Sequence, residues 1–170
     1  DKSVLWLLED NSIAVKNLRK EAKKRKIDPS RIIFAKRMSM TNHFARHKCA
    51  DLFTDTFPYG AHTTCSDSLW AGLPIVTLMG KSFASRVASS LLNAINLEEL
   101  VTSTEKEYEK LIIELANNSY RLKEIRNKLH KNRSTKPLFD TKLYTKNIEL
   151  AYTRIYEKHL NKLPTKNIDV

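Results

Sequence analysis

The sequence predicts an α/β protein with a Rossmann-like parallel sheet and helices on both faces. Four short apolar runs, centred on Leu5, Ile33, Phe53 and Val76, have the length of buried strands. Stretches with helical spacing separate them, so the chain forms a βαβαβαβ series. Right-handed crossovers then place the strands parallel and cover the sheet on both sides. After Asn96 the helical stretches follow one another, which predicts a helical C-terminal region.

The first part of the chain predicts strands at residues 4–8 and 31–34 and helices at about 13–26 and 40–48. The run at 4–8 is apolar throughout, as in a strand that is buried on both faces. A polar turn precedes the first helix, and a serine precedes the second, which suits an N-cap. In the second helix His43 and Arg46 share one face by i,i+3 spacing.

Residues 51–77 are the stretch on which the prediction of a binding site depends. They predict a strand, a turn, a helix from about residue 65 to 71, and a second buried strand. His62, Thr63 and Thr64 precede that helix and supply a hydroxyl N-cap. Asp67 falls in its first turn, and the whole unit follows a strand directly.

A helix N-terminus at the carboxyl end of a parallel strand binds anions. The two hydroxyls and the carboxylate therefore predict a nucleotide diphosphate site at the start of this helix. A plain alternative stays open. A well-capped helix with an aspartate in its first turn gains about 0.3–1 kcal/mol from the helix dipole and needs no ligand.

The remaining residues predict mostly helices. A helix is expected at about 83–92 and a short strand within 97–101. Thr104 and Glu107 form a capping box that opens a helix to about residue 117. Further helices are expected at about 120–131 and 141–160, and the last residues form a loose tail.

Several other kinds of site lack the residues they need. Gly80-Lys81-Ser82 resembles the end of a phosphate-binding loop, but that motif needs a glycine where this chain has Ile75. With 3 glycines in the chain, a glycine-rich dinucleotide fingerprint is also excluded. His43 and His47 have the spacing of metal ligands, but a third ligand with a clear relation to them is missing, although His62 or Asp67 could approach in space. We expect no metal. No GxSxG elbow supports a hydrolase.

Bulk properties narrow the class of protein further. The net charge of +11 is scattered over amphipathic helices without a recognition motif, so we expect no specific nucleic-acid partner. No apolar run reaches the length of a membrane span. Cys49 and Cys65 have no CxxC partner, which favours a reducing, cytoplasmic compartment. The chain begins at Asp1, almost inside a strand, and we expect it to be a fragment of a longer protein.

At the predicted site the sequence resembles the catalytic domain of the O-linked N-acetylglucosamine (O-GlcNAc) transferases and the SPINDLY-like proteins. The resemblance extends over nearly the whole chain without large gaps. It is carried by Asp55-Thr56, His62-Thr63-Thr64, Asp67, Leu69-Trp70-Ala71-Gly72, Pro74, Val76-Thr77, Ala84-Ser85-Arg86-Val87-Ala88, Pro137-Leu138-Phe139-Asp140-Thr141 and Tyr144. The apolar strands at 4–8 and 31–34 are similar to the same family.

The resemblance implies one half of an inverting GT-B glycosyltransferase, the half that holds the nucleotide sugar. It implies domain limits of 1–140 for the Rossmann-like domain, 141–162 for a C-terminal crossover helix and 163–170 for a tail. The crossover helix would pack on the other half, or alternatively cover the sheet of its own domain. The N-terminal catalytic half, and usually tetratricopeptide repeats, would belong to the same full-length chain. The catalytic residues are unknown here and are expected on that half, so the fragment alone should be inactive.

The resemblance also assigns roles to individual residues. Thr63 and Thr64 would hold the diphosphate of a UDP-sugar, and His62 would border the phosphate and the sugar. Asp67 would bind the ribose hydroxyls. His43 and Arg46 would lie near the nucleotide, with Arg46 toward the uracil. Because a helix N-terminus and hydroxyls offset the charge of the leaving diphosphate, neither a cofactor nor a metal is required.

The donor is expected to be a UDP-sugar, with N-acetylglucosamine as the sugar, and the acceptor a Ser or Thr hydroxyl of a protein. Other readings stay open. The family often has a lysine where this chain has Met40, and its Asn-Gly before the histidine is replaced by Gly60-Ala61. The donor could therefore be UDP-glucose or GDP-fucose, and the acceptor a bacterial glycan or asparagine. A non-catalytic binding module is the remaining alternative.

Overall fold

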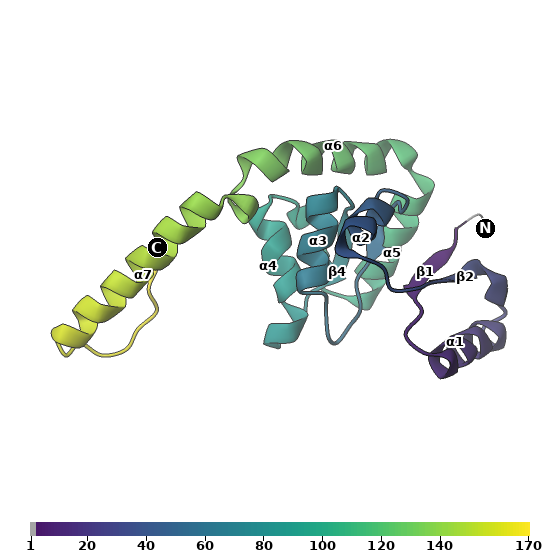
Figure 1. Ribbon diagram of the computed structural model, residues 1–170, viewed down its shortest axis with the longest axis horizontal. Coiled ribbons are helices and arrows are strands. Elements are labelled where there is room, and N and C mark those ends of the chain that lie inside the picture. Colours follow the sequence, from purple (N-terminus) through teal and green to yellow (C-terminus); the bar gives the residue numbers. More distant parts are fainter. Residues whose placement is uncertain (1–2) are drawn as a thin grey trace. The chain divides into compact units, whose positions relative to one another are not determined.

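The computed structural model describes residues 3–170, and every strand pair within them is parallel, which confirms the α/β class (Figure 1). The chain divides into two compact units, one up to Asp51 and one from Leu52 to Val170. This division lies inside the domain expected for residues 1–140. The limits that we expected at residues 140 and 162 stay predictions. Five strands lie in two parallel sheets, one with two strands and one with three.

The first unit contains a two-stranded parallel sheet and two α-helices. Its elements are β1 (Leu5–Leu8), α1 (Ser12–Lys24), the 3-10 helix η1 (Pro29–Arg31), β2 (Ile32–Ala35) and α2 (Met40–His47). β1 and β2 pair in register from Leu5 with Ile32 to Leu8 with Ala35. Asn11 caps α1 by accepting from the Ala14 N–H at 2.8 Å, and Ser39 caps α2, so both predicted caps are confirmed.

The prediction that residues 4–8 form a buried strand is wrong for the described residues. Val4 is 61% exposed and Leu5 is 47% exposed. In this unit Ala22 and Ile32 are the described apolar side chains that are buried, which is too little to cover both faces of a sheet. The apolar pattern identified the strand correctly but did not reveal whether neighbouring residues cover it.

The second unit is built on a three-stranded parallel sheet in the order β3-β4-β5. Its elements are β3 (Phe53–Thr54), α3 (Thr63–Ala71), β4 (Ile75–Leu78), η2 (Phe83–Ser85), α4 (Val87–Ala94), η3 (Glu98–Leu100), β5 (Val101–Thr102), α5 (Glu105–Asn117), α6 (Ser119–Thr135), η4 (Pro137–Phe139) and α7 (Thr141–Leu160). β4 is the central strand: Phe53 pairs with Ile75, and Thr77 with Val101.

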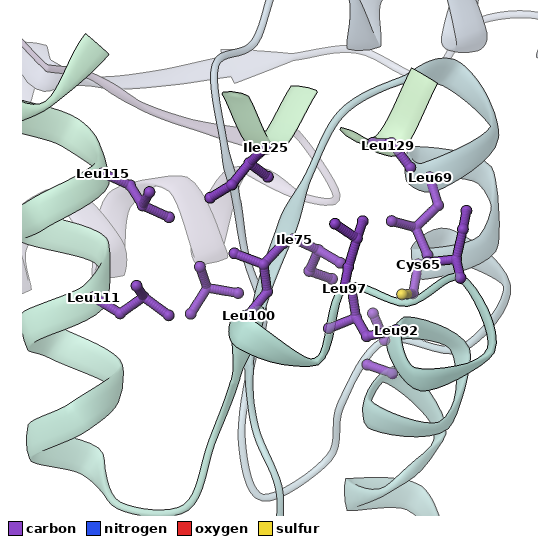
Figure 2. Packing of buried hydrophobic residues seen from close by; sticks show 14 residues of the cluster. Cys65, Leu69, Ile75, Leu92, Leu97, Leu100, Leu111, Leu115, Ile125 and Leu129 are labelled. Carbon is purple, nitrogen blue, oxygen red and sulfur yellow. The ribbon is translucent and has the colours of Figure 1, made fainter. Parts of the chain in front are cut away.

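The core of the second unit surrounds β4. Ile75 and Val76 are fully buried, as the sequence predicted for this strand. In Figure 2, Leu111 and Leu115 of α5 lie on one side of Ile75, and Cys65, Leu69 and Leu92 of α3 and α4 lie on the other. Helices therefore cover both faces of this sheet, and the arrangement predicted for it is confirmed.

Local signals located most of the later elements but not all their limits. The capping box is formed: the Glu107 N–H donates to Thr104 Oγ1, and the Glu107 carboxylate accepts from the Thr104 N–H. The helix expected at 83–92 is instead the 3-10 helix η2 followed by α4, because the Ser85 hydroxyl and N–H turn back to Ser82. The strand expected within 97–101 begins at Val101, because η3 occupies the residues before it.

α7 begins and ends where the sequence predicted and has no buried residue. The Asp140 side chain caps it by accepting from the Leu143 N–H at 2.9 Å. Ile155, Tyr156 and Leu160 are each more than half exposed. Of the two alternatives for this helix, covering the sheet of its own domain is not seen among the described residues.

The two cysteines should react very differently with a thiol reagent. Cys49 is exposed, whereas Cys65 is fully buried in α3. Burial, followed by the nearby Asp55 carboxylate, raises the pKa of the Cys65 thiol to about 12, so little thiolate forms near neutral pH. In the folded protein we expect Cys49 to be labelled and Cys65 to react at the rate of unfolding. Mass spectrometry of alkylated peptides measures both rates, and labelling of Cys65 as fast as Cys49 would contradict the described packing.

Candidate nucleotide-binding site

The N-terminus of α3 lies at the carboxyl edge of the second sheet. β3 ends at Thr54, and a loop leads to Thr63, the first residue of the helix. The first N–H groups of an α-helix have no partner inside the helix. They carry its positive dipole end, so this point of the fold attracts an anion.

The predicted hydroxyl N-cap is not formed, and this corrects the sequence interpretation. His62 is the N-cap residue, and no side chain accepts a hydrogen bond from the first turn. Thr63 is the first helical residue and Thr64 the second, so both lie beyond the N-cap position, and both are exposed. The helix end therefore keeps its first N–H groups, and the two threonine hydroxyls stand beside them.

Asp67 lies in the second turn of α3, so our placement of it in the first turn was also wrong. It follows Thr64 by three residues and Thr63 by four, which places all three side chains on one helical face. Asp67 is half-buried and makes no hydrogen bond or ion pair with residues 3–170. The plain alternative was a helix start stabilised by a capping side chain and by an aspartate in the first turn. The structure has neither of these features, so it does not support that alternative.

His62 is held firmly by its neighbours. Tyr59 stacks on its imidazole with centroids 5.1 Å apart, and Phe83 meets it edge-on at 5.8 Å. Its Nε2 lies 3.2 Å from the carbonyl oxygen of Ala84. Because a carbonyl only accepts, Nε2 carries the proton, and in the neutral ring Nδ1 is left as the acceptor.

Asp55 connects the loop before α3 to the sheet. Its carboxylate is 4% exposed and has no cationic partner among the described residues. Oδ1 accepts from the Thr56 N–H at 2.8 Å and from the Ala61 N–H at 2.7 Å. Oδ2 accepts from Thr77 Oγ1 on β4 at 2.6 Å. The Tyr108 hydroxyl on α5 donates to the Asp55 backbone carbonyl at 2.6 Å.

His43 and Arg46 lie on α2 in the first unit, where the predicted i,i+3 contact is formed. Arg46 donates to Nδ1 of His43 at 2.7 Å and to the backbone carbonyl of Lys36 at 3.2 Å. His47 Nδ1 lies 2.7 Å from the His43 carbonyl oxygen. The guanidinium is thus oriented by its own unit. That these residues and those of α3 bind one nucleotide stays a prediction.

A cavity of about 430 Å³ opens at the same edge of the second sheet. The loops after β3, β4 and β5 line it with residues that include Phe57, Lys81, Ser85 and Ser103. None of the predicted site residues is among those that line it. Among residues 3–170 no group of three or more metal-binding side chains is close enough to hold an ion, and no helix is long and apolar enough to cross a membrane.

Comparison with known proteins identifies the family. Residues 1–148 match the family model described as glycosyl transferase family 41. This chain belongs to glycosyl transferase family 41. The resemblance that we found in the sequence is therefore confirmed, and so is the fold that it implied.

Two curated relatives and one solved structure illustrate the match to family 41. The UDP-N-acetylglucosamine–peptide N-acetylglucosaminyltransferase of Caenorhabditis elegans is 35% identical over 98% of this chain. A probable enzyme of the same description from Arabidopsis thaliana, SEC, is 35% identical over 92%. A mutant of the O-GlcNAc transferase of Thermobaculum terrenum matches 90% of this chain with a TM-score of 0.82 and 30% identity.

The chain spans a small part of these family 41 proteins. It covers 14% of the Caenorhabditis elegans enzyme, 16% of the Arabidopsis thaliana protein and 30% of the Thermobaculum terrenum chain. The activity of a whole family member is therefore a proposal for this chain.

Asp55 belongs to this region, but from the sequence we assigned no role to it. It was visible as an acidic residue at the end of a strand and as part of the family motif. Its partners Thr77 and Tyr108 are 22 and 53 residues away, so no local pattern could reveal the contacts.

Alkaline pH should destabilise the second unit. Burial raises the pKa of Tyr108 to about 12, and Asp55 adds to the effect; burial likewise raises the pKa of Cys65 to about 12. The ordinary pKa is 10.0 for the tyrosine and 9.0 for the cysteine. From these values up to about pH 12, the unfolded chain loses the two protons while the folded chain keeps them. The free energy of unfolding therefore falls as the pH rises through that window and is unaffected by these groups below pH 9.

Urea unfolding at a series of pH values measures this slope. The control is Tyr108→Phe, which removes one of the two titrating groups and keeps the ring. Its free energy of unfolding should fall less steeply between pH 10 and 12 than that of the wild type. Equal slopes would show that Tyr108 is not shielded from ionisation in the folded protein.

Proposed function

We propose that this chain is the nucleotide-sugar-binding half of an inverting glycosyltransferase. It would hold a UDP-sugar, with N-acetylglucosamine as the sugar, for transfer to a Ser or Thr hydroxyl of a protein. The observation that carries the proposal is the start of α3, which has no capping side chain and presents exposed hydroxyls and a carboxylate without a protein partner. The descriptions of the two curated relatives name this donor and a peptide acceptor.

The start of α3 would bind the diphosphate. Its first N–H groups and the hydroxyls of Thr63 and Thr64 are hydrogen-bond donors, and the helix dipole adds favourable potential for negative charge. When the sugar leaves, negative charge grows on the diphosphate, and fixed donors of this kind stabilise it without reorganising. The same residues would thus bind the donor and assist its departure, and no metal is needed in this proposal.

The other site residues would bind the nucleoside. Asp67, one turn further along α3, would accept hydrogen bonds from the ribose hydroxyls. Arg46 would approach the uracil, and His43 would lie beside it. The proposal places the general base on a catalytic half outside residues 1–170, so that these residues alone bind UDP and do not turn over sugar.

A non-catalytic nucleotide-binding module is the second candidate, and Met40 favours it. Met40 is 59% exposed at the first position of α2, where the family often has a lysine. A thioether offers no positive charge to a nucleotide. Activity of the full-length protein decides between the two candidates.

Calorimetric titration with UDP tests the site. Asp67→Ala should weaken UDP binding by about tenfold or more, because it removes charge-assisted hydrogen bonds worth about 1.5–3 kcal/mol. Thr64→Ala should weaken it by about two- to tenfold, the equivalent of one neutral hydrogen bond of about 0.5–1.5 kcal/mol.

Ser66→Ala is the matched control for these variants. Ser66 lies on α3 between Thr64 and Asp67 in the sequence. Because it is two residues from Thr64, its side chain points to another side of the helix. It should bind UDP as the wild type does. If UDP gives no heat with the wild-type protein, or if all three variants bind equally well, the site assignment is wrong.

A panel of donors in the full-length protein tests the sugar and the nucleotide. We expect transfer from UDP-N-acetylglucosamine to a peptide containing Ser or Thr, and slower transfer from UDP-glucose or GDP-fucose. Mass spectrometry of the peptide measures the added mass and its position. Faster transfer from another donor would correct the sugar, and binding of UDP without any transfer would favour the non-catalytic module.

A further inference from the structure

We propose that Asp55 is a positioning residue for the diphosphate end of this site. It would act through the loop between β3 and α3 and would touch no substrate. The inference rests on the proposed function, because it assumes that the start of α3 binds UDP. It goes beyond that proposal by naming the residue that holds the phosphate-binding end in place.

The first argument is how the carboxylate is used. One oxygen, Oδ1, accepts from the N–H of Thr56 at 2.8 Å and of Ala61 at 2.7 Å. Thr56 and Ala61 lie near the two ends of the loop, which runs from Asp55 to His62, so a single oxygen atom ties those ends together. Ala61 immediately precedes His62, the N-cap of α3. A displacement of the Ala61 N–H therefore moves the residue at which the helix begins.

The second argument is that the other contacts of Asp55 anchor it to rigid elements. Oδ2 accepts from Thr77 on β4, and the backbone N–H of Asp55 donates to Val76 of the same strand at 3.0 Å. Its backbone carbonyl accepts from Tyr108 on α5. Thr77 is 1% exposed and belongs to the centre of the sheet. Asp55 thus connects the core to a loop whose residues 56–59 are exposed.

The third argument is that a buried carboxylate without a cationic partner is costly unless each oxygen is well paired. A structural loop could be closed with neutral groups at less cost. A Cβ added at Gly60 would lie 3.1 Å from Asp55 Oδ2 and 3.3 Å from the Ala84 carbonyl oxygen, which is tighter than most Cβ contacts, so a neighbour would have to move by a few tenths of an ångström. The carboxylate and the glycine fit each other, as expected for a loop whose geometry matters.

The proposed effect is confined to one end of the site. The body of α3 is fixed independently by Cys65 and Leu69, which are fully buried in the core. Asp67 lies on that body, so its place should not depend on Asp55. A positioning role therefore predicts weaker binding of a ligand with phosphates and unchanged binding of one without them.

The test compares UDP with uridine in the full-length protein. In Asp55→Asn the loop N–H groups keep at most a neutral oxygen as acceptor, and the NH2 group that replaces Oδ2 donates to Thr77 instead of accepting from it, so both anchoring contacts are weaker. We expect the Kd for UDP to rise about tenfold or more and the Kd for uridine to stay unchanged. Equal loss of both ligands would indicate a general structural role and would overturn the proposal.

Thr77 provides variants that leave the carboxylate in place. Thr77→Val removes the hydroxyl that anchors Oδ2 and should weaken UDP binding, while Thr77→Ser keeps the hydroxyl and should restore it. Thr102→Val is the matched control. Thr102 is also a buried strand threonine, 6% exposed, and its hydroxyl donates to the backbone carbonyl of Thr77 at 2.9 Å and not to the Asp55 carboxylate, so its removal tests the β4–β5 contact alone.

The outcomes separate the two proposals. If the wild type does not bind UDP, the proposed function fails. If the wild type binds UDP and Asp55→Asn and Thr77→Val bind it equally well, only the role of Asp55 fails. If Thr102→Val loses as much UDP affinity as Thr77→Val, the loss reflects a weakened sheet and the role of Asp55 is also overturned. Selective loss of UDP in the Asp55 and Thr77 variants supports it.

Discussion

The hydrogen bonds of the Asp55 carboxylate are the interaction on which the candidate site depends. They join a loop with mostly exposed residues to β4, the most deeply buried strand of the second unit. Each bond to the carboxylate involves a charged acceptor and is stronger than a neutral one. The end of the loop is also held by the Gly60 N–H, which donates to the Ala84 carbonyl at 3.0 Å, but Ala84 belongs to η2 and not to the sheet. The core fixes β4 and α3, and Asp55 fixes the loop that leads from the sheet to α3.

The start of α3 exchanges stability for binding capacity. A serine, threonine or aspartate as N-cap would stabilise the helix by about 1 kcal/mol. In this position the chain has His62, whose ring is directed to the Ala84 carbonyl and held between Tyr59 and Phe83. The N–H groups of the helix end are then left for a ligand. Residues that lower stability without a structural benefit are common at functional sites.

Local sequence signals predicted the elements well, because caps, breakers and apolar periodicity act over a few residues. The capping box at Thr104 and the end of α3 at Gly72, whose φ is +87°, are examples. The same signals misplaced the hydroxyls of Thr63 and Thr64, since a threonine before a helix and one at its first position look alike in sequence. The contacts of Asp55 and the exposure of β1 depend on residues far away in the chain or on covering surfaces, and no local pattern contains them.

The apolar surfaces of this chain bear on how a complete site would be assembled. Three of the four residues of β1 are exposed, and the fourth is half-buried. Along α7, Tyr144, Tyr152, Ile155 and Tyr156 are exposed. Water disfavours such surfaces, and large ones on soluble proteins generally mark contact with another body. In the proposed function this chain contributes donors for a diphosphate, and the general base belongs to a second body. A second body that completes the proposed site and the exposed apolar side chains of this chain are consistent with each other.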